Sequence, residues 1–257
     1  MSVHLHNERP YGDPITAEAQ AYEYVLEQIR LGVFRAGDRL IAENIAHEIG
    51  VSRMPMREAF RRLSSEGLLH IRPNRGVIVR GLNAAEMREA FEMRAVLEAQ
   101  AARAALAFLD DSDLYELDAL VDRMEHSASD TSRWVTAHRH FHEFLARLAR
   151  RPRLGTQIGA LHALVEPHMR MWLEHRTVSA DSLAQHRALL TALKRGDAQE
   201  VEKAFRQHIE RTIAPLEKLL SPEATGPGLP PAAIPGQTTT SFGCDSRQPV
   251  PLRKHNA

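Results

Sequence analysis

The pattern that most restricts the fold of this chain lies in residues 40–80: two short helices separated by a glycine and followed by a hairpin. Ile41, Ile45 and Ile49 recur every four residues, so they form one apolar stripe on the first predicted helix. Gly50 is able to adopt a positive φ and end that helix. This order of elements predicts a winged helix-turn-helix, a fold whose second helix reads DNA.

The second predicted helix has a basic face opposite an apolar one. Ser52 is placed to cap its start. Three arginines recur every four residues and share the basic face: Arg53, Arg57 and Arg61. Three large apolar residues form the other face: Met56, Phe60 and Leu63. A guanidinium can bind guanine O6 and N7 or hold a phosphate. A solvated arginine face is the alternative, but the turn and the hairpin favour a recognition helix.

The hairpin carries further basic residues. Strand-forming residues at 69–72 and 77–79 flank the turn sequence Pro73-Asn74-Arg75-Gly76. Arg75 and Gly76 at its tip are suited to entering a minor groove or approaching the DNA backbone. Residues 51–80 contain seven arginines and two glutamates, a local net charge of +5, whereas the whole chain has 33 basic and 33 acidic residues. The positive charge is therefore confined to one module, which favours site-specific binding of double-stranded DNA.

This segment contains several short motifs: Gly32-x-Phe34-x-x-Gly37-x-x-Leu40, Gly50-Val51-Ser52-Arg53-x-Pro55-x-Arg57-Glu58-Ala59, Arg62-Leu63, Glu66-Gly67-Leu68 and Arg75-Gly76-x-x-Val79. With them, residues 16 to 80 resemble the DNA-binding domain of the GntR family of bacterial transcription regulators. The resemblance implies that Arg53, Arg57 and Gly76 contact operator DNA. Asn44 stands where some members carry a DNA-contacting arginine, so that contact is not carried over.

The remaining chain predicts a mostly α protein. Residues 83–220 show a helical period throughout, with expected helices at about 84–108, 111–127, 131–150, 153–176, 179–195 and 197–219. Six helices with short connections predict an antiparallel bundle. The expected parts are a flexible arm (1–14), the winged helix-turn-helix (15–81), a helical effector-binding and dimerisation domain (82–220) and a disordered tail (221–257). No apolar stretch is long enough for a membrane span. The one cysteine, Cys244, leaves no intrachain disulfide, so a cytoplasmic location is expected.

Histidines are the candidate metal ligands of this bundle. His138 and His142 are four residues apart on one helix, so both imidazoles can bind one ion. His186 and His208 lie on the fifth and sixth predicted helices. Spacing alone leaves ordinary core or surface roles open. Arg94, if it faces the interior, needs an anion; a ligand carboxylate and Glu98, four residues along the same helix, are the two alternatives.

The bundle also has family motifs, namely Arg94-x-x-Leu97-Glu98, His138-x-x-Phe141-His142, His186-x-x-Leu189-Leu190, Gly196-Asp197 and His208. With these, residues 84 to 220 resemble the FCD effector domain of one GntR subfamily. That resemblance implies a divalent metal bound by an Asp and three His, which match His142, His186 and His208. His138 stands at the Asp position, and a fourth imidazole favours Zn²⁺ or Ni²⁺. Alternatively, no metal binds and the histidines hold an anion directly. The usual Ser-Gly-Asn after this helix reads Ala149-Arg150-Arg151.

Together these observations predict a ligand-responsive transcription regulator, and not an enzyme. The resemblance implies a homodimer that reads two half-sites of an operator and a small carboxylate effector held by the metal and Arg94. Relief of repression is expected, rather than activation. A metal sensor, for which the ion itself is the signal, is the nearest alternative. A His-rich metallohydrolase is a distant one, because no His-Glu-x-x-His motif accompanies the histidines.

Overall fold

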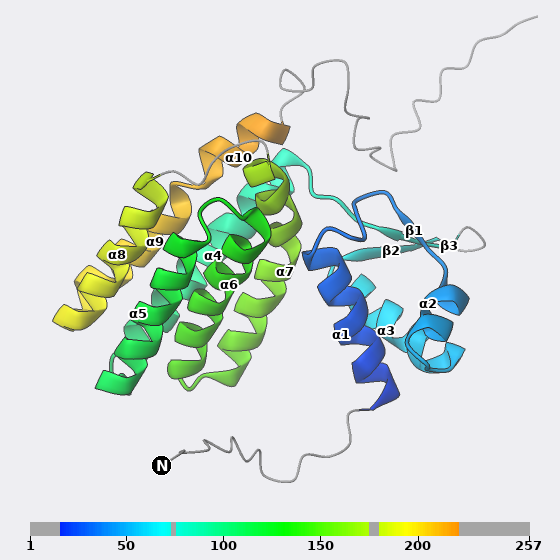
Figure 1. Cartoon of the computed structure of the whole chain (residues 1–257), viewed down its shortest axis with the longest axis horizontal. Helices are drawn as coiled ribbons and strands as arrows, with labels where there is room; N and C mark the ends of the chain where they lie inside the picture. Colours follow the sequence, from blue (N-terminus) through cyan, green and yellow to red (C-terminus); the bar gives the residue numbers. More distant parts are fainter. Residues whose placement is uncertain (1–15, 73–75, 175–179, 221–257) are drawn as a thin grey trace, which may run out of the picture.

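The computed structural model describes residues 16–72, 76–174 and 180–220, which form a helical bundle beside a smaller unit of helices and a sheet (Figure 1). The expected arm (1–14) and tail (221–257) lie outside the described residues, as does Arg75 at the tip of the wing. Of the helices described, none combines the length and apolar character needed to cross a bilayer.

The smaller unit is the predicted winged helix-turn-helix. Its helices are α1 (Ala17–Arg30), α2 (Ala42–Glu48) and α3 (Arg53–Ser65). Strands β2 (Leu69–Arg72) and β3 (Gly76–Val79) form the wing hairpin with His70 opposite Ile78. A two-residue strand, β1 (Arg39–Leu40), pairs with β3 and completes an antiparallel sheet in the order β1-β3-β2. The wing hairpin was predicted from its sequence; β1 was not, because two residues carry no alternation signal.

Local details of the helix-turn-helix differ from the sequence pattern. Gly50 has φ +72° and ends the first helix, as expected. Ile41, however, precedes α2 in an extended conformation and is 45% exposed, so the buried stripe does not include it. Ser52 occupies the position before α3 without a capping hydrogen bond from its side chain. The predicted apolar face of α3 is buried.

The larger unit is an all-α bundle with α4 at its centre. Its helices are α4 (Ala84–Ala105), α5 (Asp111–His126), α6 (Thr131–Leu148), α7 (Pro152–Glu174), α8 (Ala180–Arg195), α9 (Ala198–Glu210) and α10 (Ile213–Leu220). The mostly α prediction is confirmed, but the sixth predicted helix is divided into α9 and α10. Pro215 explains the break, since it has no N–H to donate to the carbonyl of Arg211 in a continuous helix.

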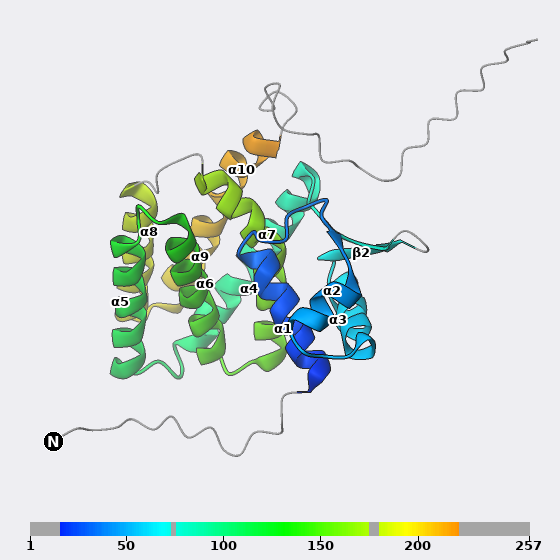
Figure 2. The ribbon, with the colours of Figure 1, turned by 45° about the vertical axis from the view of Figure 1, so that its right-hand side comes forward.

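Helix α7 belongs to both units. Its Val165 and Met169 pack in the bundle core, whereas Ala163 is buried in the core of the winged helix-turn-helix. Helix α1 lies between α7 and the recognition helix α3 (Figures 1 and 2). His168 of α7 also accepts a hydrogen bond from the backbone N–H of Leu82, in the connection between the units, at 3.1 Å. The winged helix-turn-helix is therefore packed directly on the helical bundle.

Candidate functional site

Four histidines from three helices meet inside the bundle. His138 and His142 come from α6, His186 from α8 and His208 from α9. Each offers one ring nitrogen within 4.8 Å of the others, and all four side chains are buried. The ring centroids of His138 and His142 are 4.5 Å apart, as are those of His186 and His208. The i, i+4 histidine pair of α6 thus meets two histidines that are distant in the sequence.

Hydrogen bonds at Nδ1 orient two of these rings, and a carboxylate lies close to a third. The Nδ1 of His186 lies 2.8 Å from the Ser182 carbonyl oxygen, and that of His208 lies 3.3 Å from Gln185 Oε1. The Nδ1 of His142 lies 2.5 Å from Glu98 Oε2. In His186 and His208 the acceptor at Nδ1 places the proton there and leaves Nε2 as the free lone pair. Within the described residues, Nε2 of His142 and of His186 is buried without a hydrogen-bond partner.

The burial of the cluster keeps imidazoles neutral. Burial lowers the pKa of His186 to about 3, with a contribution from His142. It also lowers the pKa of His138 and of His208 well below the usual histidine range, and the neighbouring histidines add to the effect. Neutral imidazole is the form that binds a metal. Buried, unpartnered lone pairs are costly unless something occupies the space between them, so the donor set fits a divalent cation.

A buried charged group lies beside the histidines. Arg94 donates from Nε to Glu98 Oε1 at 2.8 Å, and its Nη2 lies 3.1 Å from Nε2 of His162. Burial opposes the charged carboxylate, but Arg94, His142 and His162 together hold the pKa of Glu98 well below its usual range. Arg94 faces the interior, and Glu98 is its intrachain partner. Its Nη1 nevertheless remains buried without a partner among the described residues.

His162 of α7 was not anticipated from the sequence. It is 2% exposed and contacts Glu98 Oε1 at 3.1 Å. The signal was present: His162 interrupts the apolar series of Ile158, Leu161 and Val165, where a polar side chain must find a buried partner. Only the contact with Glu98 of α4 identifies the partner of His162, and residue spacing within α7 does not predict that contact.

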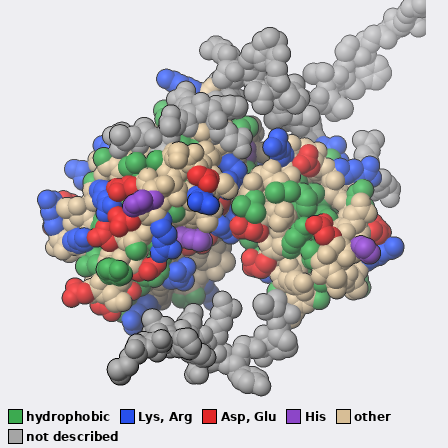
Figure 3. All heavy atoms as spheres, viewed as in Figure 1, with side chains coloured by type: hydrophobic (Ala, Val, Ile, Leu, Met, Phe, Trp, Pro, Cys, Tyr) green, Lys and Arg blue, Asp and Glu red, His purple; other side chains and the backbone are tan. Residues whose placement is uncertain are grey.

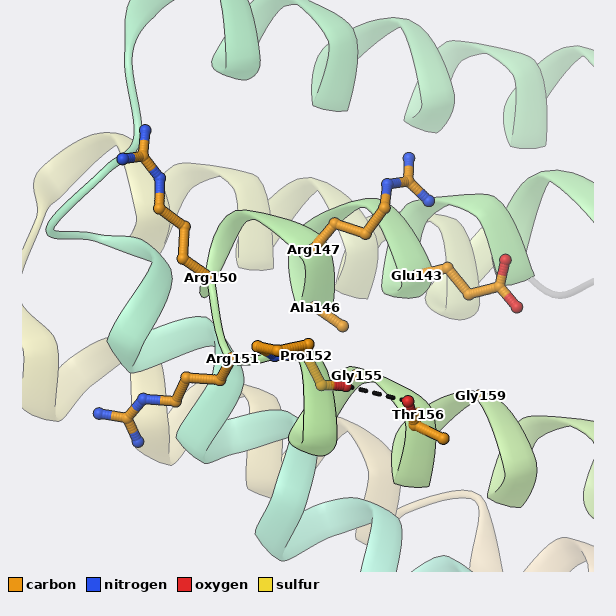
Figure 4. A pocket seen from close by; sticks show the side chains of 9 residues that line it. All are labelled: Glu143, Ala146, Arg147, Arg150, Arg151, Pro152, Gly155, Thr156 and Gly159. Carbon is orange, nitrogen blue, oxygen red and sulfur yellow. Dashed lines mark hydrogen bonds between the residues drawn. The ribbon is translucent and has the colours of Figure 1, made fainter. Parts of the chain in front are cut away.

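A surface hollow between the ends of α6 and α7 is separate from this cluster. It is lined by Arg147, Arg150, Arg151 and Thr156, among others, and the three guanidinium groups point away from one another (Figure 4). Thr156 donates to the carbonyl of Pro152 at 3.0 Å. The diverging cations do not form a common anion site, so the buried cluster remains the candidate for ligand binding.

The predicted DNA-contacting residues of the helix lie on its exposed side. Ser52, Arg53, Arg57 and Arg61 are all exposed. Arg53 lies 3.4 Å from Glu43 of α2, and Arg61 pairs with Glu58. No ion pair of Arg57 is found among the described residues, so its guanidinium is available. Basic side chains also gather at the upper right edge of the smaller unit, toward the wing (Figure 3).

Near the tip of the wing, Gly76 begins β3 with φ +90°, a conformation that disfavours other residues. A Cβ there would lie 3.0 Å from Nε of Arg39. The glycine therefore lets the Arg39 side chain pass close to the hairpin backbone.

The sequence also matches two protein families over these units. Residues 17–79 match the gntR family of bacterial regulatory proteins, and residues 89–211 match the FCD domain. A regulator encoded in the TAR-I ttuE-ttuC' intergenic region of Agrobacterium vitis is 33% identical over 147 residues, which cover 54% of this chain and 85% of the relative. The chain belongs to the GntR family. It is a DNA-binding transcription regulator of the GntR/FCD type, and that family consists of regulators rather than enzymes.

Other relatives of this GntR regulator include named repressors. The transcriptional repressor RspR of Escherichia coli is 28% identical over 193 residues, covering 74% of this chain and 85% of RspR. A probable D-xylose utilization operon repressor of Paenarthrobacter nicotinovorans is 30% identical over 197 residues, covering 76% and 86%. The solved structure of E. coli McbR/YncC has the same fold, with a TM-score of 0.74 and 24% identity over 81% of this chain and all of that one.

Proposed function

We propose that this GntR regulator binds a divalent metal, Zn²⁺ or Ni²⁺, through His138, His142, His186 and His208. The observation that carries the proposal is the pair of buried, unpartnered Nε2 atoms on His142 and His186, which lie in the four-histidine cluster. A bound ion would supply positive charge and open coordination positions for an anionic ligand. The all-imidazole set favours these ions over Mg²⁺ or Mn²⁺.

The metal assignment is tested by elemental analysis of the freshly purified protein. We expect about one zinc or nickel ion per chain, lost in His138→Ala. His140→Ala is the matched control, because His140 lies on the same helix but is exposed. Retention of the ion in His138→Ala would remove that residue from the ligand set. No uptake even in excess ion would assign the histidines to direct anion binding or to packing.

We further propose that the effector is a small carboxylate that binds the metal and Arg94. The support is Nη1 of Arg94, a buried donor without a partner beside the histidine cluster. Zinc-loaded protein would be titrated calorimetrically with a panel of small mono- and dicarboxylates. We expect binding that is lost in Arg94→Lys, because a lysine cannot pair with Glu98 and a second carboxylate in the same fork geometry. Equal binding by this variant would exclude Arg94.

In the proposed function, α3 reads the operator and the effector relieves repression. Arg57→Ala should weaken specific binding by about 1–3 kcal/mol, the range for one bidentate base contact. The matched control is Arg147→Ala, an exposed arginine of the bundle. A gel-shift titration at fixed salt decides; unchanged affinity in Arg57→Ala would refute the assignment of the recognition helix. A metal sensor is distinguished in the same assay, because a carboxylate would then cause no further change in the DNA affinity of the zinc-loaded protein.

The proposed regulator is a homodimer that contacts two half-sites. Support comes from α4, whose side opposite Arg94 exposes Met93 and Val96 by 46% and 49%. Apolar residues on both sides of a helix indicate that both sides become covered. We expect sedimentation to give twice the chain mass, and Val96→Glu to shift the equilibrium toward the monomer. A monomeric wild-type protein would contradict the proposal.

A further inference from the structure

A buried group of charged residues joins the effector bundle to the DNA-binding unit. At its centre is Glu166 of α7, which is 3% exposed. Three arginines surround its carboxylate: Arg30 of α1 at 3.8 Å, Arg139 of α6 at 3.5 Å and Arg170 of α7 at 3.8 Å. We refer to these four residues with Glu27 and Glu143 as the junction. Three acidic and three basic side chains make it neutral overall.

The junction holds the C-terminal end of α1 from two sides. Arg139 forms a two-pronged pair with Glu27 of α1, at 3.2 and 3.5 Å. Arg30 lies 3.6 Å from Glu143 of α6, and Arg170 donates from Nε to the Arg30 carbonyl at 2.9 Å. A cation near the carbonyl end of a helix is favourable. Both α6 and α7 thus fix the position of α1, which packs against α3.

The carboxylate of Glu166, at the centre of the junction, has only long contacts with its partners. Both oxygens of Glu166 are buried without a hydrogen-bond partner in the described part of the chain, and all three guanidinium contacts exceed normal hydrogen-bond length. Burial raises the pKa of Glu166 to about 7, although Arg139, Arg30 and Arg170 oppose that shift. Buried charges in such a geometry contribute little to stability. Closing the Arg139 contact to a charge-assisted hydrogen bond requires a movement of about 0.7 Å.

The same helices carry the histidine cluster. On α6, His138 and His142 point to the cluster, while the next residues in sequence, Arg139 and Glu143, belong to the junction. On α7, His162 contacts Glu98, and one turn later comes Glu166. A small displacement of α6 at the cluster therefore also displaces the junction, and sub-ångström shifts are sufficient to switch packed interfaces.

We propose that Glu166 is a positioning residue, through which α6 and α7 transmit the state of the histidine cluster to α1 and the recognition helix. The proposal rests on the metal-binding function above. It predicts that neutralising Glu166 uncouples DNA affinity from the metal while leaving the histidine ligands intact.

The test uses the full-length chain, Zn²⁺ and an operator fragment selected from randomised DNA. In wild-type protein, zinc should change DNA affinity by about fivefold or more, the lower end of typical allosteric coupling. In Glu166→Gln the zinc affinity of DNA-free protein should stay within about twofold, while the zinc effect on DNA affinity falls toward none. Glu116→Gln is the matched control, since it neutralises a carboxylate paired with Arg123 on α5, a helix that carries no proposed ligand. Wild-type coupling in Glu166→Gln would overturn the proposal.

A second measurement does not depend on the metal. Spin labels at Ser65→Cys on α3 and Tyr115→Cys on α5, in a Cys244→Ser background, report the distance between the units. Glu166→Gln should broaden or shift the distance distribution, and Glu166→Asp, which keeps the charge, should restore part of it. Identical distributions in all variants would overturn the positioning role. If zinc fails to bind, the metal proposal fails, and this measurement alone decides for Glu166. Circular dichroism of each variant identifies one that does not fold, and Arg139→Lys then replaces it.

Discussion

At the scale of single residues, Arg150 occupies a position in the turn after α6 whose backbone conformation favours glycine. Arg150 has φ +50°, in the left-handed region that costs a side chain free energy. Its guanidinium lies 4.4 Å from the centre of the Phe108 ring, a contact at the surface that offsets little of this cost.

We expect Arg150→Gly to raise the free energy of unfolding by about 1 kcal/mol, because glycine adopts this conformation without strain. Urea denaturation measures the change. Arg150→Ala is the control, since it removes the guanidinium and keeps the strain, and it should give no gain. Equal stabilities of the glycine and alanine variants would show that the left-handed conformation is not costly here.

His168 gives a pH dependence that belongs to one residue. Its neutral Nε2 accepts the Leu82 N–H, and burial lowers its pKa. A lowered folded-state pKa means that the contribution of His168 is complete above pH 6.5, the unfolded value, and is lost as the pH falls below it.

In metal-free protein with chelator, His168→Gln should reduce this loss, because the amide oxygen accepts the same hydrogen bond without titrating. Below pH 6.5 the wild-type protein should lose up to about 1.4 kcal/mol per pH unit more than the variant. Urea midpoints between pH 7.5 and 5.5 measure the difference. Parallel curves for the two proteins would contradict this role of His168.

At the scale of helices, α9 depends on the residue that precedes it, Asp197, which caps its start. Asp197 accepts hydrogen bonds from the backbone N–H groups of Gln199 and Glu200, at 2.8 and 2.9 Å. Asp197→Ala should lower the unfolding free energy by about 1 kcal/mol, and Asp197→Asn should restore most of it. Thermal or urea unfolding checks both variants. An unchanged unfolding free energy in Asp197→Ala would mean that water replaces the capping carboxylate without cost.

Helix periodicity could be predicted from the sequence because most helices bury one apolar side. The division between α9 and α10 was missed, although Pro215 marks it, because the apolar period continues through the break. Strand β1 was missed because its conformation is imposed by pairing with Ile78 and Val77 of β3. Residue patterns within one segment therefore predict most helices, whereas a short strand that is imposed by pairing with another segment is missed.

For the candidate site, the family motifs selected the four histidines, and the structure brings all of them together. The environment of Arg94 was left open between Glu98 and a ligand, and only the packing of α4 against α7 shows its contact with His162. The junction was not anticipated at all. Arg30 and Glu166 are separated by about half of the chain, and neither lies in a recognisable motif.

At the scale of the whole molecule, metal binding should stabilise the fold, since the histidines come from three helices. Zinc at one hundred times its dissociation constant should add about 2.7 kcal/mol, which corresponds to a rise of about 5–10 °C in Tm. Differential scanning fluorimetry with zinc or chelator measures the shift. His142→Ala should abolish it, and His140→Ala should leave it unchanged. Equal shifts in both variants would place zinc elsewhere on the chain.

The double use of α6 and α7 limits how freely the two halves of this protein can be exchanged. A DNA-binding unit taken from a relative would bring its own end of α1, and without counterparts of Glu27 and Arg30 it would leave Arg139 and Glu166 buried beside mismatched charges. Chimeric regulators built on this effector bundle therefore need to keep Glu27 and Arg30 of α1 when the recognition helix is exchanged. The boundary for such grafts runs through α1, and not through the connection around Leu82.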